Sequence, residues 1–147
     1  MTSMGAERAA RAAAVTTWSY AAGFGLPAVP VAVYLMTQGR LPSFFGLFDM
    51  YDGRWASRLK PEQFAALLTA FLVLTGAAAW SARGVWRGRR VGAMVNLALI
   101  PLEAIFWVGF ALPIPWAVGV ARVALLAAGW RSLDASARLG SPYASRR

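Results

Sequence analysis

The sequence predicts an all-α integral membrane protein, a four-helix bundle whose two ends both lie in the cytoplasm. Hydrophobic residues make up 59% of its 147 residues and charged residues only 14%, a balance that is rare in soluble domains of this size. Four windows are long and apolar enough to span a hydrocarbon core of roughly 30 Å, which takes about 20 helical residues. They cover about 14–36, 63–82, 91–112 and 114–130, and they predict one membrane domain over residues 1–147.

The windows are predicted to be helices because they are continuous apolar runs rich in Ala and Leu. The strands of a membrane barrel would alternate apolar and polar residues over segments of about 10 residues. The lipid bilayer is therefore the first partner that the sequence predicts, and the cell membrane is the predicted location of this multi-pass protein.

The first window is predicted to be an uncleaved and interrupted span. Residues 1–13 carry Arg8 and Arg11 as a signal peptide would, but the apolar window behind them is longer than the roughly 7–15 residues of a signal core. Two glycines and two prolines near its middle are expected to kink or partly unwind the helix. The break either forms a substrate site or only lets small residues pack; its residues are Gly23, Gly25, Pro27 and Pro30.

The basic residues predict the orientation. Ten Lys and Arg residues fall in the N-terminal segment, the second loop and the tail 131–147, whereas four fall in the first loop and none in the third. The positive-inside rule places the side with ten in the cytoplasm. Because nearly all of the net charge of +9 flanks the apolar windows, where it orients spans and meets anionic lipid, no nucleic-acid partner is expected.

The first loop, residues 37–60, is the one sizeable segment predicted outside. Its aromatic residues recur at spacings close to a helical turn, which predicts a short amphipathic helix at the membrane interface. Two interpretations stay open: a belt that anchors the loop, or a lid or partner-binding surface that includes Trp55. The aromatic residues are Phe44, Phe45, Phe48, Tyr51 and Trp55.

Asp49 and Asp52 are the acidic candidates of this loop. Two carboxylates three residues apart, without further oxygen ligands, fall short of a calcium loop. We therefore expect them to pair with Arg54 and Arg58.

Prolines are predicted to set two helix boundaries. Pro61 suits the first turn of the second span, where its missing N–H costs nothing, and Glu62 favours the same helix end. Pro113 and Pro115 leave a connection of only a few residues between the third and fourth windows, which predicts a tight antiparallel hairpin.

Two ionisable residues fall inside the predicted spans, Glu103 in the third and Arg122 in the fourth. Each lies nine residues from the hairpin turn, so they are expected at the same depth, where a bidentate pair would offset the cost of burying either charge. Asn96 shares the face of Glu103 and is expected to add a polar contact. The pair either fixes the register of the hairpin or belongs to a proton or solute path.

Small residues predict packing surfaces on the fourth span. Gly119 and Gly129 share the helical face of Arg122 and are expected to bring the two backbones of the hairpin close together. A stripe of alanines is expected to pack against another helix; its members are Ala117, Ala121, Ala124 and Ala128.

The residues that usually carry catalysis are missing from the composition. The chain has no His and no Cys, which removes the commonest general base, the thiolate nucleophile and the usual zinc and haem ligands. The sequence also has no nucleophile elbow and no phosphate-binding loop. We therefore predict no enzyme, no catalytic residue, no metal site and no cofactor.

Two segments, FDMYDGRW at 48–55 and LIPLEAIFWVGFALPIP at 99–115, are similar to small uncharacterised four-span membrane proteins of high-GC bacteria. These proteins carry no assigned activity. The resemblance implies a four-span fold in a bacterial plasma membrane, and it transfers no substrate or catalytic residue.

The predicted function is that of a non-enzymatic helper or subunit of a membrane assembly, whose partner is another membrane protein or a second copy of the chain. The first alternative is a small proton-coupled or ion or solute transporter that uses Glu103 and Arg122. The second alternative is a membrane enzyme acting on lipid-linked substrates, with Asp49 and Asp52 as its acids.

Overall fold

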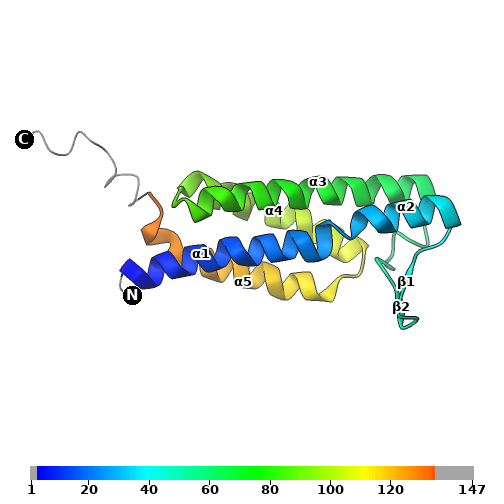
Figure 1. Ribbon diagram of the computed structural model, residues 1–147, viewed down its shortest axis with the longest axis horizontal. Helices are drawn as coiled ribbons and strands as arrows, with labels where there is room; N and C mark the ends of the chain where they lie inside the picture. The colour runs from blue at the N-terminus through cyan, green and yellow to red at the C-terminus, as the bar shows by residue number, and fades with distance from the viewer. Residues whose placement is uncertain (1–2, 135–147) are drawn as a thin grey trace, which may run out of the picture.

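The computed structural model of the protein describes residues 3–134 and is a bundle of helices (Figure 1). Within this range, four helical stretches are long and apolar enough to cross a membrane, as predicted: Met4–Gln38, Pro61–Trp86, Arg90–Gly109 and Pro113–Ser132. The elements are α1 (Ser3–Tyr20), η1 (Ala21–Gly25), α2 (Ala28–Gln38), β1 (Ser43–Phe44), β2 (Phe48–Asp49), α3 (Pro61–Trp86), α4 (Arg90–Gly109), α5 (Pro113–Gly129) and η2 (Trp130–Ser132).

The first stretch is longer than predicted and is interrupted where predicted. It begins at Ser3 rather than near residue 14, because the alanine-rich residues before the apolar window also favour a helix. The turn η1 is a π-helix, in which the Leu26 N–H donates to the Ala21 carbonyl, five residues back, at 3.0 Å. A Cβ atom on Gly25 would collide with the Thr75 side chain. The break therefore lies tightly against α3.

The helix boundaries set by proline are confirmed. Pro61 begins α3, and the Lys60 N–H donates to the Gln63 side-chain oxygen at 3.1 Å, which satisfies an N–H group that the helix itself leaves unpaired. Pro113 begins α5 only four residues after α4 ends at Gly109. The tight connection between the third and fourth spans was thus predicted correctly, although α4 ends three residues before the predicted boundary at 112.

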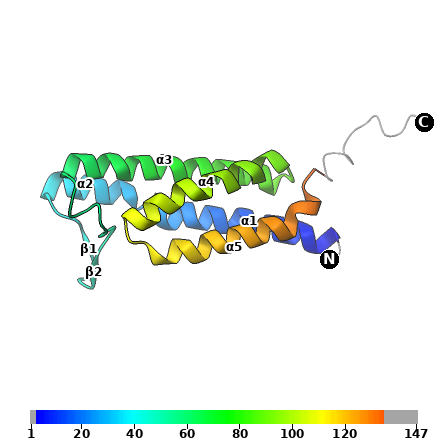
Figure 2. The same cartoon turned by 180° about the vertical axis from the view of Figure 1, so that it is seen from behind.

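The helices of the hairpin are not each other's main neighbours. α5 packs mainly against α1, and α4 packs mainly against α3, which also contacts α1 and α2. In Figure 2, α4 approaches α3 toward the end where α4 begins, whereas α5 runs along α1. The room between α4 and α5 is filled by large side chains, including the fully buried Trp107 and Arg122.

The two ends of the bundle differ in what they carry (Figure 2). The terminal end, as we call it, holds the start of α1, the connection 87–89 and η2; of the predicted tail, residues 135–147 lie outside the described part of the chain. The loop end holds residues 39–60 and the connection 110–112.

The loop of residues 39–60 is a hairpin with turns, and the prediction of an amphipathic helix there was wrong. β1 and β2 pair antiparallel, with Ser43 opposite Asp49 and Phe44 opposite Phe48. Gly46 (φ +74°) in the connecting turn has a left-handed backbone conformation, which glycine adopts without a steric penalty and which ends any helix. The aromatic spacing therefore arises from strands and turns rather than from one helical face.

Two packing clusters form the core. At the loop end, a cluster rich in aromatic residues joins the loop to α2, α3 and α4, with Tyr51, Phe71 and Phe110 at its centre. At the terminal end, alanines of α1 pack against α3 and α5, and a Cβ atom on Gly129 would lie 2.6 Å from the Ala10 nitrogen. Gly129 therefore lets α5 approach α1, whereas the prediction was that it brings α5 close to α4, its partner in the hairpin.

Candidate functional site

Glu103 and Arg122 form a fully buried ion pair between α4 and α5. The Arg122 Nη1 donates to Glu103 Oε2 at 2.5 Å, and both side chains are 0% exposed. The predicted equality of their depth is therefore confirmed. A charge buried alone costs several kcal/mol, about 3–5 kcal/mol when one partner of a pair is removed, so each residue is held in the interior by the other.

The prediction of a bidentate pair was wrong, because the guanidinium of Arg122 is shared between Glu103 and Asn96. Its Nε and Nη2 donate to Asn96 Oδ1 at 3.2 and 2.8 Å. Asn96 can reach the guanidinium because it lies two turns before Glu103 on the same buried face of α4. The predicted polar role of Asn96 is confirmed, and it is larger than expected because Asn96 takes half of the guanidinium.

Asn96 extends the polar contacts to two further helices. Its Nδ2 donates to Ser81 Oγ of α3 at 2.9 Å and lies 3.5 Å from Thr17 Oγ1 of α1. Both hydroxyl groups donate back to carbonyls of their own helices, at 2.7 and 2.8 Å. We call Thr17, Ser81, Asn96, Glu103 and Arg122 the buried polar network; it joins α1, α3, α4 and α5.

A second pair lies beside this network on the side of the loop end. The Trp107 indole N–H donates to the Tyr20 hydroxyl at 2.7 Å, and the Arg122 Cζ lies 5.3 Å from the centre of the Tyr20 ring. A cation over an aromatic face is attracted by the ring quadrupole. A Cβ atom on Gly119 would lie 2.6 Å from the Trp107 ring. Gly119 therefore makes room for the indole, and the prediction that it brings two backbones close was wrong.

Sequence reasoning missed Thr17, Tyr20 and Ser81. Each stands in an apolar window, where a single hydroxyl group gives no sign of which way it faces. The weak signal for Tyr20 is its position directly before the break in the first span. The break lies against α3 and thereby fixes where the Tyr20 ring enters the bundle.

One atom of the network is unsatisfied. Glu103 Oε1 is buried and has no hydrogen-bond partner within residues 3–134. A buried carboxylate oxygen without a donor is costly. A proton added to this oxygen, or a polar group bound to it, would therefore change the hydrogen bonding of the network.

The candidates of the loop lie apart from this network. Asp49 and Asp52 are exposed, and neither makes an ion pair with Arg54 or Arg58 in the part of the chain that the structure describes, so that expectation was wrong. Trp55 is half-buried instead. Its ring packs edge-on against Phe106 and Phe110 at centroid distances of 5.6 and 5.3 Å. Trp55 therefore fixes the loop to α4.

Tyr51 also holds the loop in place. It has a left-handed φ of 60°, which is rare for a bulky residue and persists only when its surroundings enforce it. Its hydroxyl donates to the Phe24 carbonyl in the π-helical turn. Burial raises the pKa of the Tyr51 phenol above its ordinary value. The loop is thus bound to the break in the first helical stretch by a hydrogen bond.

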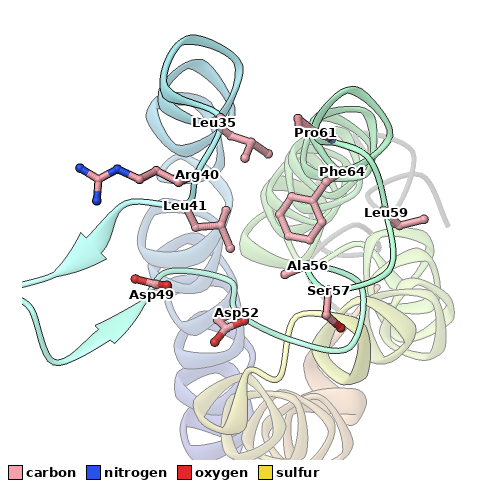
Figure 3. A pocket seen from close by; sticks show the side chains of 11 residues that line it. Leu35, Arg40, Leu41, Asp49, Asp52, Ala56, Ser57, Leu59, Pro61 and Phe64 are labelled. Carbon is pink, nitrogen blue, oxygen red and sulfur yellow. The ribbon is translucent and has the colours of Figure 1, made fainter.

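A pocket of about 400 Å³ lies between this loop and the ends of α2 and α3. Leu35, Leu41 and Phe64 point toward one another across it, whereas the Arg40 guanidinium points away (Figure 3). Asp49 and Asp52 border the pocket from the loop. An apolar pocket with two carboxylates beside it suits an organic cation or an ammonium headgroup better than a bare metal ion. Within residues 3–134, no three acidic or other metal-binding side chains cluster.

Comparisons with protein-family models, with curated proteins and with solved structures found no match to this chain. The resemblance of residues 48–55 and 99–115 to small four-span proteins of high-GC bacteria therefore stays a prediction. The assignment of function depends on the geometry of the site.

Proposed function

We propose that the chain is a non-enzymatic subunit or helper of a larger membrane assembly, inserted in a bacterial plasma membrane with both ends in the cytoplasm. The observation that carries this proposal is the sealed charge pair. Glu103 and Arg122 are 0% exposed, and their other contacts are made within the bundle. A pair placed in this way is closed to solvent and fixes how the helices pack.

The outer surface of the bundle supports the same proposal. The four alanines of the predicted stripe on α5 are all exposed, so they do not pack against a helix of this chain: Ala117, Ala121, Ala124 and Ala128. Small residues at such spacing let a second helix approach closely in a membrane, where van der Waals packing drives association. This alanine stripe is the surface that we propose contacts the partner.

Co-purification in a mild detergent tests the proposal. The tagged full chain is purified from its native host, and proteins present in stoichiometric amount are identified by mass spectrometry. The test variant A117L/A121L enlarges two residues of the alanine stripe, and the control A66L/A70L makes the same change at two exposed positions of α3. We expect one partner that is lost from the test variant and kept by the control. A chain that purifies without a partner contradicts the proposal.

A transporter is the second candidate, and one observation favours it. The unsatisfied Glu103 Oε1 lies in the same interior as the π-helical break of the first span, and broken helices and buried carboxylates both occur in transport sites. The test is proton flux into vesicles that contain the purified chain. Flux that E103Q abolishes would establish the transporter, and its absence from the wild type would exclude a proton carrier.

A further inference from the structure

A groove of about 720 Å³ runs between α3 and α4 at the terminal end. Gly84 and Gly92 line it and bring the two helices close together: a Cβ atom on Gly92 would lie 2.8 Å from the Gly84 Cα. Ser81, whose hydroxyl contacts Asn96 of the buried polar network, also lines the groove. The groove is thus a fixed feature of the place where the two helices meet.

Three arginines give one part of this groove a strong positive charge. Arg83, Arg87 and Arg89 line it, and none of the three makes an ion pair within residues 3–134. Among the residues that the structure describes, no carboxylate lines the groove; the nearby Asp134 is paired with Arg90 at 3.5 Å. Three cations around one concave surface attract an anion, and guanidinium groups match the geometry of phosphate oxygens.

The remainder of the groove is apolar and lies farther from the terminal end. Trp80 on α3 is 72% exposed and lies about one to two helical turns before Arg83 and Arg87. Val95 on α4 is 43% exposed and lies about one to two turns after Arg89. The Arg83 guanidinium lies 5.2 Å from the centre of the Trp80 ring. A tryptophan beside arginines is typical of the level of the lipid headgroups. Charge is therefore followed by apolar surface toward the middle of the bundle.

We propose that this arginine groove binds one anionic phospholipid. The phosphodiester lies among Arg83, Arg87 and Arg89, and an acyl chain runs along Trp80 and Val95. A free phosphate would leave the apolar half of the groove uncovered, and a zwitterionic lipid would leave the positive charge unbalanced. Basic pockets between membrane helices bind anionic headgroups for these reasons. The inference rests on the proposed insertion in a membrane, and it is independent of the proposed partner protein.

Native mass spectrometry of the detergent-purified chain tests this binding. The probes are phosphatidylglycerol, phosphatidylcholine with the same acyl chains, and glycerol phosphate as a headgroup without chains. We expect phosphatidylglycerol to stay bound at concentrations where the other two dissociate. R83Q/R87Q/R89Q should weaken its binding by about tenfold or more, since each arginine near a lipid surface contributes severalfold.

Two controls separate the groove from general charge and shape effects. R8Q/R11Q/R131Q removes three charges at the same end but outside the groove and should bind as the wild type does. A77W fills the apolar half of the groove without changing its charge and should weaken binding, whereas A70W, one and a half to two turns away on α3, should not. All variants are compared at matched thermal stability.

Four results would overturn the proposal. Equal losses in the two triple variants would show a diffuse charge effect. Equal binding of phosphatidylcholine and phosphatidylglycerol would show that the arginines do not select the headgroup. Wild-type binding by A77W, or equal retention of glycerol phosphate, would show an anion site without a place for the lipid chain.

Discussion

In the middle of the bundle, Glu103, Arg122 and Asn96 join helices through an ion pair and hydrogen bonds, whereas at the loop end aromatic rings such as Tyr51 and Phe110 pack at a centroid distance of 5.3 Å. Removing one charge of a buried pair leaves the other uncompensated. A substitution in a packed aromatic cluster leaves no charge unpaired, and its effect on stability depends on the change in side-chain volume. The middle should therefore be sensitive to the loss of one partner, and the loop end to a change in size.

The largest effect is expected for Arg122→Leu. It leaves the Glu103 carboxylate buried without a cation and removes both donors to Asn96 Oδ1, so we expect a loss of about 3–5 kcal/mol in the free energy of unfolding. Arg131→Leu, at an exposed arginine, is the matched control. Equilibrium unfolding in detergent measures the stability of both variants. Equal stability of the two would contradict the expectation that the middle of the bundle is sensitive to the loss of one charged partner.

Gly109→Ala should have the next largest effect. The added Cβ atom would enter the Trp55 ring, and overpacking of this kind costs about 1–3 kcal/mol. Gly76→Ala is the control, because nothing lies within 4 Å of the Cβ position at Gly76 and alanine favours a helix over glycine. A neutral Gly109→Ala in the same unfolding assay would show that the loop end does not depend on close packing.

Tyr51→Phe should have a smaller effect with a distinct pH dependence. It removes the hydrogen bond to the Phe24 carbonyl, which contributes about 1 kcal/mol. Burial raises the pKa of Tyr51, so the folded chain keeps this proton at a pH where the unfolded chain, with an ordinary pKa of about 10, loses it. The stabilising contribution is complete below pH 10 and falls as the pH rises above it. Thermal unfolding of wild type and variant between pH 8 and about pH 12 should therefore converge at the alkaline end; parallel curves would contradict this role.

The smallest effect is expected for D49N/D52N. Both side chains are exposed and make no ion pair among residues 3–134, so the melting temperature should change by less than about 2 °C. Differential scanning fluorimetry checks this. A large destabilisation would show that the pocket carboxylates hold the loop in place, which the contacts of Tyr51 and Trp55 are expected to do alone.

The comparison also separates what the sequence could predict from what it could not. The number of apolar helices, the break near Gly25 and the common depth of Glu103 and Arg122 follow from length, composition and spacing along one chain. The contacts of Asn96 with Thr17 and Ser81 depend on where α1 and α3 lie, which spacing within one hairpin does not contain. The prediction of a helix in the loop was wrong because the aromatic spacing fits a helix, whereas the left-handed backbone of Gly46 and Tyr51 is incompatible with a continuous one.

The central claim is that Glu103 and Arg122 act as one structural unit, and a double-mutant cycle tests it most directly. The unfolding free energies of E103Q, R122L and E103Q/R122L are measured against the wild type in the same detergent. We predict that the double variant is more stable than R122L alone, with a coupling energy of at least about 1.5 kcal/mol. Additive losses, with the double variant the least stable of the three, would contradict the claim.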